Sequence, residues 1–159
     1  MSHSPADGEP QDLQRVRRRL QQLDTTPPTR WRETGLQGEV LDETAVLIPM
    51  FERDGDLYVV FTHRAAHLDN HSGEVSFPGG RVEAVDADRQ ETALREAHEE
   101  IALPPAEVRV FGALTEMPTV TGFHIRAYIG EFGNGSRLEA NPAEIETNFA
   151  ASLGELADR

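Results

Sequence analysis

The chain has 159 residues, of which 38% are hydrophobic and 27% charged, and its formal net charge is −13 at pH 7. This length and composition suit one globular domain, and the acidic balance argues against a nucleic-acid-binding surface. The absence of cysteine excludes disulfides, a thiol nucleophile and a zinc–thiolate site. No apolar run is long enough to span a membrane, and the first residues lack signal-peptide character. We therefore expect a cytoplasmic protein without a membrane partner.

The N-terminal part, residues 1–43, is expected to form a helix and a linker that is packed on the main domain or flexible beside it. Apolar residues recur at helical spacing between Gln11 and Leu23, which predicts an amphipathic helix. The stretch that follows, 24–43, is rich in Pro and Thr, as is typical of irregular structure. The main domain is then predicted to span residues 44–159.

Two strands are predicted at 44–51 and 57–62, because both runs are rich in β-branched and aromatic residues. The pair Asp54-Gly55 between them is typical of a β-hairpin turn. A polar loop follows, and then a third, short strand at 75–77.

A helix is predicted next, beginning at Asp86 or Asp88 and ending near Ala102. Asp88 and Glu91 have the spacing of a capping box at the start of this helix. Two consecutive prolines follow its end, where they stop the helix.

The remaining elements are strands at 108–114 and 123–132 and a short helix at 153–157. The loop between the two strands, 116–122, is a candidate part of a functional site. The order α–β–β–β–α–β–β–α predicts an α+β fold, an α/β/α sandwich in which helices flank a mixed β-sheet.

The central helix carries three carboxylates, Glu96, Glu99 and Glu100, within roughly 100° of one another, while its opposite face is apolar. Carboxylates at such close quarters repel one another unless a cation lies between them, and oxygen ligands favour Mg²⁺ or Mn²⁺ over zinc. The alternative is a solvated acidic helix face. The stretch 77–80 (FPGG) favours a metal site, because a Pro-Gly-Gly turn can bring backbone against the carboxylates.

These motifs together resemble those of the Nudix hydrolase family, whose box reads G-x5-E-x7-R-E-U-x-E-E-x-G-U, where U is a bulky apolar residue. The matching positions are Gly80, Arg95, Glu96, Glu99, Glu100 and Leu103. The connector between Gly80 and Arg95 is one residue longer than in the box. The first box carboxylate therefore falls on Asp86 when counted forward and on Ala87 when counted back. Ala102 replaces the last glycine of the box.

A second pattern, before the box, resembles the coenzyme A pyrophosphatase branch of this family, which reads L-L-T-x-R-[SA]-x3-R-x3-G-x3-F-P-G-G. The residues at matching positions are Phe61, Thr62, Arg64, Ala65, Gly73 and Phe77 to Gly80. Pro142 to Ile145 resembles a later P-x-E-V segment of the same branch. Two features depart from it. Asp69 stands where the branch has its second Arg, and the sequence ends at Arg159, before a further C-terminal stretch that the branch carries.

The resemblance implies hydrolysis of a pyrophosphate bond in a nucleoside diphosphate derivative. The branch implies coenzyme A or an acyl-CoA as substrate, with 3′,5′-ADP and 4′-phosphopantetheine or its acyl form as products. The alternatives are an ADP-ribose or NADH pyrophosphatase, and a domain that binds a nucleotide without cleaving it. The divalent ion, Mg²⁺ or Mn²⁺, would be held by Glu96, Glu99, Glu100 and the backbone carbonyl of Gly79. The partner is a small nucleotide, and a homodimer is compatible with the resemblance.

Four residues are candidates for the catalytic machinery. Arg95 lies one helical turn before Glu99 and is expected to orient the carboxylates. The general base stays open between Glu99, Glu100 and two residues that loops would bring in, Glu144 and Glu116. We retain Arg95, Glu99, Glu100 and Glu144 as the catalytic set.

Substrate contacts are expected from the residues that match the second pattern, with Arg64 as the candidate for a phosphate contact. The substrate-binding set is Arg64, Gly73, Phe77 and Gly80. His67 and His71 have the i,i+4 spacing that can suit zinc. No third ligand is evident in the sequence, so we expect no zinc site there.

Overall fold

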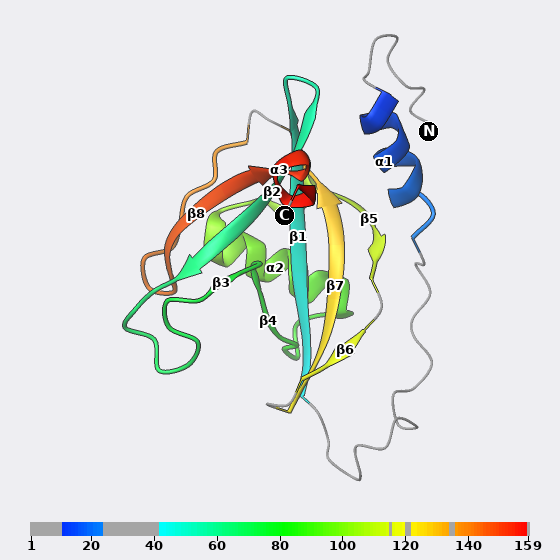
Figure 1. The fold of residues 1–159 in the computed structure, drawn as a ribbon. Coiled ribbons are helices and arrows are strands. Elements are labelled where there is room, and N and C mark those ends of the chain that lie inside the picture. The colour runs from blue at the N-terminus through cyan, green and yellow to red at the C-terminus, as the bar shows by residue number, and fades with distance from the viewer. Residues whose placement is uncertain (1–10, 24–41, 115, 120–121, 134–135, 159) are drawn as a thin grey trace.

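The computed structural model describes residues 11–23, 42–114, 116–119, 122–133 and 136–158. In this part of the chain a twisted sheet lies between helices, with α2 behind the sheet and α3 in front of it in the view of Figure 1. The elements are α1 (Gln11–Leu20), β1 (Asp42–Arg53), β2 (Asp56–Arg64), β3 (Val75–Ser76), β4 (Gly79–Arg81), α2 (Arg89–Ile101), η2 (Pro105–Glu107), β5 (Arg109–Ala113), β6 (Met117–Pro118), β7 (Phe123–Glu131), β8 (Ile145–Ser152) and α3 (Leu153–Ala157).

The sheet is mixed, which confirms the predicted α+β class. The strand order is β3-β2-β1-β7-β5, with β4 paired to β1, β6 to β7 and β8 to β2. The long β1–β7 pair is parallel, whereas the other strand pairs of the described residues are antiparallel. β1 therefore lies in the centre of the sheet. β4 pairs with β1, and α2 packs against it.

The hairpin between β1 and β2 forms as predicted. Arg53 pairs with Asp56, and the two residues between them, Asp54 and Gly55, have φ values of 52° and 80°. Two consecutive positive φ values define a type I′ turn, whose twist matches that of the flanking strands. The local Asp-Gly signal thus fixes the register of the two strands.

Three strands differ from the sequence prediction, namely β4, β8 and β6, the last of which lies within the stretch 116–122 that was predicted to be a loop and pairs with β7. The predicted turn at Gly79 and Gly80 was wrong, because these residues form strand β4 and pair with Val46 and Ala45. A Cβ at Gly79 would lie 2.5 Å from the carbonyl oxygen of Ala45, so glycine is needed here for close strand approach rather than for a turn. Strand β8 was not predicted.

The helix that bears the glutamates begins and ends where its capping residues predict. Asp88 is the N-cap, and its side chain accepts the N–H of Glu91 at 2.8 Å, while the Glu91 carboxylate accepts the N–H of Ala87. At the other end Ala102 adopts a left-handed conformation with φ of 56° and donates its N–H to carbonyls of the last turn. Such C-terminal caps satisfy carbonyls that the helix itself leaves unpaired.

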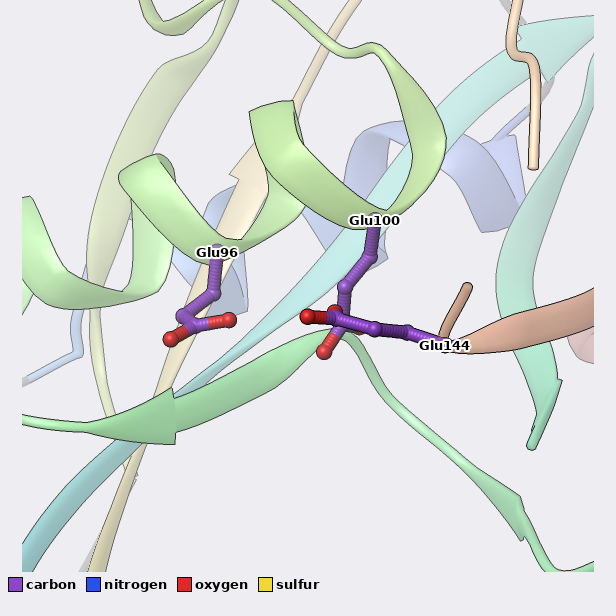
Figure 2. A group of neighbouring side chains, drawn as sticks. All are labelled: Glu96, Glu100 and Glu144. Carbon is purple, nitrogen blue, oxygen red and sulfur yellow. The ribbon is translucent and has the colours of Figure 1, made fainter. Parts of the chain in front are cut away.

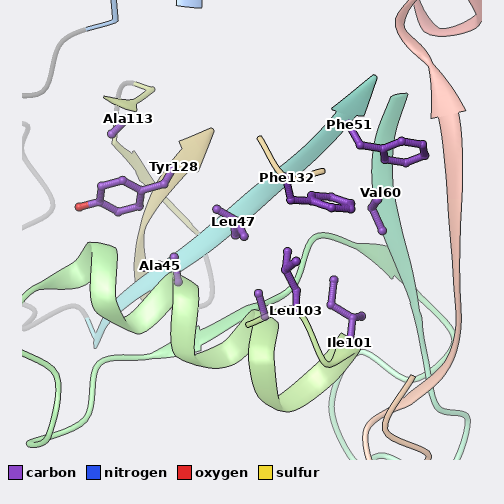
Figure 3. Packing of buried hydrophobic residues seen from close by; sticks show 11 residues of the cluster. Ala45, Leu47, Phe51, Val60, Ile101, Leu103, Ala113, Tyr128 and Phe132 are labelled. Atoms are coloured by element: carbon purple, nitrogen blue, oxygen red, sulfur yellow. The ribbon is translucent and has the colours of Figure 1, made fainter. Parts of the chain in front are cut away.

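The main hydrophobic core lies between α2 and the sheet (Figure 3). Ala93, Ala97 and Ile101 of the helix are fully buried in one cluster with Leu47 of β1 and Val60 of β2. Figure 3 labels Ile101, Leu47 and Val60 of this cluster. The small alanines let the helix approach the sheet closely, and each large buried aliphatic side chain contributes about 1.5–3 kcal/mol. Because this face of α2 is fixed by packing, its opposite face is held in a constant position for the glutamates.

Helix α1 contacts the sheet on the side away from α2. Leu20 is buried in a cluster with apolar residues of β1, β2 and β7, and Val16 packs against the same cluster. Arg17 pairs with Glu52 of β1 at 2.7 Å and with Glu131 of β7 at 2.5 Å. The amphipathic helix expected from the sequence is therefore present and docked.

Most of the predicted linker falls in residues 24–41, which lie outside the described residues. The division into 1–43 and 44–159 stays a prediction. Within the described ranges, none of the helices is long and apolar enough to cross a membrane.

Candidate active site

Three carboxylates from two parts of the chain meet beside β4 (Figure 2). Glu96 and Glu100 come from successive turns of α2, and Glu144 comes from the segment that enters β8. Each residue offers an oxygen, and these three atoms lie within 4.8 Å of one another. Two glutamates at i,i+4 lie on the same side of a helix, so the third residue is the one that the tertiary fold must supply.

The electrostatics of the cluster favour a bound cation. Glu100 is only 2% exposed, and burial together with the negative charges of Glu96 and Glu144 raises its pKa to about 8. Burial also raises the pKa of Glu96, with a further contribution from Glu99. Three ionised carboxylates at this separation are costly unless a proton or a cation compensates them. Oxygen ligands suit a hard divalent cation, so the residues present fit the ion that the sequence predicts.

The two glycines of β4, Gly79 and Gly80, lie against the carboxylates of Glu100 and Glu96. A Cβ at Gly80 would overlap the carboxylate of Glu96. The backbone N–H of Gly79 donates a hydrogen bond to Glu100, which opposes the rise in its pKa. The structure therefore brings the N–H of Gly79 to the cluster. The predicted role of the Gly79 carbonyl as a metal ligand stays a prediction.

Arg95 is bound on several sides by acidic residues. Its Nε and Nη2 donate to the two carboxylate oxygens of Asp86 at 2.9 and 3.0 Å, and its Nη1 donates to Glu96 at 3.1 Å and to Glu99 at 3.2 Å. The same contacts hold the pKa of Asp86 well below its usual range, and Asp86 raises the pKa of Arg95. Arg95 is thus placed to orient Glu96, and Asp86 fixes Arg95.

Glu99 lies outside the group of three. Its side chain is 48% exposed and contacts Arg95 rather than Glu100 or Glu144. Asp86, which is the first box carboxylate when counted forward from Gly80, also lies outside this group, because Arg95 and the hydroxyl of Thr92 hold it.

Arg64, the candidate phosphate ligand, lies at the end of β2 close enough to Glu100 to stabilise its charged form. The Nε atom of Arg64 is buried, and among the described residues it has no hydrogen-bond partner. Gly73 adopts a φ of 71° and donates its N–H to the Arg64 carbonyl at 3.2 Å. Phe77 stacks on Phe61, with 5.0 Å between the ring centroids.

Glu116, an alternative general base in the sequence prediction, lies in a different cluster. It is buried and accepts a hydrogen bond from Arg89, and it pairs with His124 at 2.5 Å and with Arg126 at 3.8 Å. Its charge is therefore balanced within that cluster, and it does not join the group around Glu100.

Several residues around the cluster carried no recognised signal in the sequence. The pairing of Asp86 with Arg95 and Thr92 was not predicted, although Asp86 was a candidate for the first box carboxylate.

His67 and His71 do not share a partner: His67 contacts the carbonyl of Ala143, and His71 contacts the carboxylate of Glu74. An Asn-Pro pair before Glu144 would have indicated a turn, since both residues are favoured in the first half of type I turns.

The fold and the carboxylate helix define the class of protein. The NUDIX domain family matches residues 41–148, and the chain therefore belongs to the Nudix family. It is 39% identical over 113 residues to an uncharacterized Nudix hydrolase, NudL, of an Enterobacter species, which covers 71% of this chain and 58% of that protein. A NudL protein of Citrobacter koseri is 38% identical over 122 residues, covering 76% and 63%. The chain thus spans about three fifths of the length of these relatives.

Solved structures show the same fold at low sequence identity. RenU, a Nudix hydrolase of M. smegmatis, has a TM-score of 0.61 at 20% identity and covers 74% of both chains. The C. elegans Ap4A hydrolase in a binary complex has a TM-score of 0.60 at 14% identity, covering 74% of this chain and 85% of that one. The NUDIX domain of Shewanella oneidensis NrtR, complexed with ADP ribose, has a TM-score of 0.57 at 16% identity and covers 76% and 78%.

Proposed function

We propose that this protein hydrolyses a pyrophosphate bond in a nucleoside diphosphate derivative, with Mg²⁺ or Mn²⁺ held by Glu96, Glu100 and Glu144. The observation that carries the proposal is the meeting of these three carboxylates within 4.8 Å in a chain of the Nudix family. A divalent ion held by these residues would lower the pKa of a water molecule and offset negative charge in the transition state.

The residues of the chain divide the remaining work. Glu100 is buried and accepts the Gly79 N–H, so it suits a fixed ligand role. Each glutamate offers the cation one oxygen. Because Glu144 is only partly buried and enters from a loop, we assign the general base to its second carboxylate oxygen. Arg95 orients Glu96 from the side. Arg64, with its unpartnered Nε beside the acidic cluster, is our candidate for a phosphate contact, since Arg binds phosphate through a planar fork of donors.

For the substrate we propose coenzyme A or an acyl-CoA, because Arg64, Gly73 and Phe77 stand at matching positions of the pattern of that branch. The products would be 3′,5′-ADP and 4′-phosphopantetheine or its acyl form. Asp69, at the position of the second Arg in that pattern, is the observation that keeps ADP-ribose and NADH as alternative substrates. The NrtR domain in complex with ADP ribose supports a nucleotide of this kind as ligand.

A domain that binds such a nucleotide without cleaving it is the second candidate. The intact set of carboxylates argues against it, because binding alone does not need three metal-ligating glutamates. A cytoplasmic location and a homodimer stay predictions, and light scattering after size-exclusion chromatography measures the second.

One experiment separates these functions. Purified protein is incubated with Mg²⁺ and, in parallel, with coenzyme A, ADP-ribose and NADH, and the products are identified by mass. We expect cleavage of coenzyme A. Cleavage of only ADP-ribose or NADH would contradict the substrate assignment, and tight binding of one compound without cleavage would support the binding domain.

The matched variants are Glu100→Gln and Glu99→Gln, neighbouring glutamates on the same helix. Loss of outer partners of a metal site costs 10- to 100-fold in activity, so removal of a ligand at Glu100 is expected to cost at least about 100-fold. Glu99 is exposed and lies outside the group, and Glu99→Gln should cost much less. Equal activity of Glu100→Gln and the unmodified protein would show that the metal site lies elsewhere.

A further inference from the structure

The third carboxylate is delivered by a turn whose geometry follows from its sequence. Glu144 donates its N–H to the carbonyl of Asn141 at 3.0 Å, which closes a β-turn over Asn141-Pro142-Ala143-Glu144. Asn in the first position and Pro in the second are favoured in type I turns. The side-chain Oδ1 of Asn141 also accepts the N–H of Ala143 at 3.1 Å. One residue therefore fixes the turn through both its backbone and its side chain.

This turn is attached to the end of α2. Asn141 donates its N–H to the carbonyl of Glu100 at 2.8 Å, and Glu139 donates to the carbonyl of Ile101 at 3.0 Å. The last carbonyls of a helix have no partner within the helix, so a passing segment can bind them. As a result, the backbone of Glu100 holds the turn whose last residue, Glu144, meets the side chain of Glu100.

A second attachment comes from the loop after β2. The N–H of Ala65 donates to the carbonyl of Glu144 at 3.0 Å, and the Nε2 of His67 lies 3.0 Å from the carbonyl of Ala143. A carbonyl can only accept, so Nε2 of His67 carries the hydrogen in this contact. Because Nε2 is a donor both in this neutral tautomer and in the imidazolium form, the contact does not depend on the charge of the ring.

We propose that Asn141 and His67 are positioning residues that hold Glu144 against Glu96 and Glu100, an inference that rests on the proposed metal site. The two helix glutamates are fixed by the packing of α2, but Glu144 is repelled by both and enters from a loop with access to solvent. Without the turn and the imidazole contact, its carboxylate moves towards solvent, and the cation loses one of three ligands. His67 acts through the carbonyl of Ala143, the residue before Glu144.

The test measures the affinity of the full chain for Mn²⁺ alone, by paramagnetic resonance titration without substrate. Asn141→Ala and His67→Ala are expected to weaken Mn²⁺ binding by about 5-fold each, the effect of one lost hydrogen bond. Asn141→Ser keeps a short acceptor and His67→Gln keeps an N–H donor, so both should restore most of the affinity. The control is His71→Asn, which removes an imidazole of the same loop that contacts Glu74 instead. Asn tolerates the positive φ of 54° at that position.

A second readout uses the metal-free protein. The amides of Glu144 and Ile145 both donate to the carbonyl of Asn141, at 3.0 and 2.8 Å. We expect their hydrogen exchange to accelerate in Asn141→Ala and to return towards the unmodified rate in Asn141→Ser. If Asn141→Ala does not fold, the His67 pair of variants decides the question.

The outcomes separate this inference from the function on which it rests. If Glu144→Gln and Glu100→Gln leave Mn²⁺ affinity unchanged, the metal site is wrong and the positioning roles fail with it. If Glu144→Gln weakens binding but Asn141→Ala and His67→Ala match the unmodified protein, only the positioning roles are overturned. The positioning roles are also overturned if the conservative variants bind Mn²⁺ as weakly as the alanine variants.

Discussion

The guanidinium of Arg95 and the carboxylate of Asp86 form a two-point contact, with Nε–Oδ1 and Nη2–Oδ2 distances of 2.9 and 3.0 Å. The Asp86 side chain is 3% exposed and also accepts the hydroxyl of Thr92 and the N–H of Glu83. Asp86 lies in the longer connector between Gly80 and the acidic helix, whereas Arg95 lies on the helix itself. Asp86, which is the first box carboxylate when the box is counted forward from Gly80, therefore binds Arg95 and does not join the group of Glu96, Glu100 and Glu144.

Replacing Asp86 by Asn tests this pairing. The variant keeps the shape of the side chain and loses its charge, so Arg95 loses a charge-assisted contact in a nearly buried place. We expect a loss of about 1.5–3 kcal/mol in the free energy of unfolding, measured by urea denaturation. Glu83→Gln is the control, since Glu83 contacts the same Arg95 at 3.7 Å with a 59% exposed side chain. An equal effect of both variants would contradict a special role of Asp86.

The pH dependence of the same pair has a definite sign. The pKa of Asp86 is depressed in the folded protein, so its stabilising contribution is present above the ordinary carboxylate pKa and is lost as pH falls towards the folded value. Asp86→Asn should therefore flatten the acid side of the stability curve. Urea midpoints at a series of acidic pH values measure this difference, and parallel curves for the two proteins would refute it.

The contribution of Glu100 to stability depends on pH in the opposite direction. Its pKa is raised to about 8 in the metal-free fold, so the folded state binds a proton that the unfolded state releases near the ordinary Glu value. This contribution to stability is present at acidic pH and is lost as pH rises towards about 8. In metal-free protein at pH 8–9, Glu100→Gln should thus be more stable than the unmodified chain.

Divalent cations should reverse that order. With saturating Mg²⁺ or Mn²⁺, the unmodified protein gains binding free energy that Glu100→Gln cannot gain in full. Thermal unfolding with and without the ion, at pH 6 and pH 9, measures both effects. A higher melting temperature for Glu100→Gln under all four conditions would contradict a cation site at this residue. Glu99→Gln, with its exposed side chain, is the matched control.

The two adjacent glycines of β4 are needed for different reasons, which mutations can separate. A Cβ at Gly80 meets the movable end of the Glu96 side chain, so Gly80→Ala should displace that carboxylate and weaken Mn²⁺ binding with little loss of stability. A Cβ at Gly79 meets the backbone of Ala45 and Val46 at 2.5 and 2.8 Å. Gly79→Ala should therefore destabilise the fold by about 1–3 kcal/mol.

Mn²⁺ titration and urea denaturation of both variants separate the two effects. Gly133→Ala is a suitable control, because within the described part of the chain, its two chain neighbours aside, no heavy atom lies within 4 Å of a Cβ at that position. If Gly80→Ala loses stability and keeps Mn²⁺ affinity, Glu96 is not placed by this glycine.

The parts of the fold that the sequence predicts are those with local signals. Asp54-Gly55 specifies the hairpin. The acidic helix begins after Asp88 and ends before Ala102 in the structure, as its sequence predicts. Strand β8 carries no such signal, because six of its eight residues are exposed or half-exposed polar and small side chains, and Phe149 is 44% exposed. Its pairing with β2 is a long-range contact that only the folded chain makes evident.

The same holds for the candidate site: the part that lies on one helix could be predicted from the sequence, and the position of the residue that comes from elsewhere in the chain could not. The helical wheel places Glu96, Glu99 and Glu100 on one face, yet Glu99 lies about 60° from Glu96 on the side opposite to Glu100, towards Arg95. The structure follows this finer geometry, since Glu99 contacts Arg95 and Glu144 takes the third position. The presence of Glu144 instead of Glu99 in the group of three depends on the turn before β8, and the periodicity of a helix cannot indicate that turn.

The last prediction concerns Glu116, which the sequence left as an alternative general base. Its carboxylate is buried with Arg89, His124 and Arg126. Removing one member of a buried charge cluster leaves the others without compensation and costs about 3–5 kcal/mol. Glu116→Gln should therefore lower the free energy of unfolding strongly while Mn²⁺ affinity at the Glu100 cluster stays within about 2-fold, less than the effect of one lost hydrogen bond. Assays at low temperature, where the variant remains folded, should retain most hydrolysis. A variant that is stable, binds Mn²⁺ normally and has lost hydrolysis would instead identify Glu116 as the base.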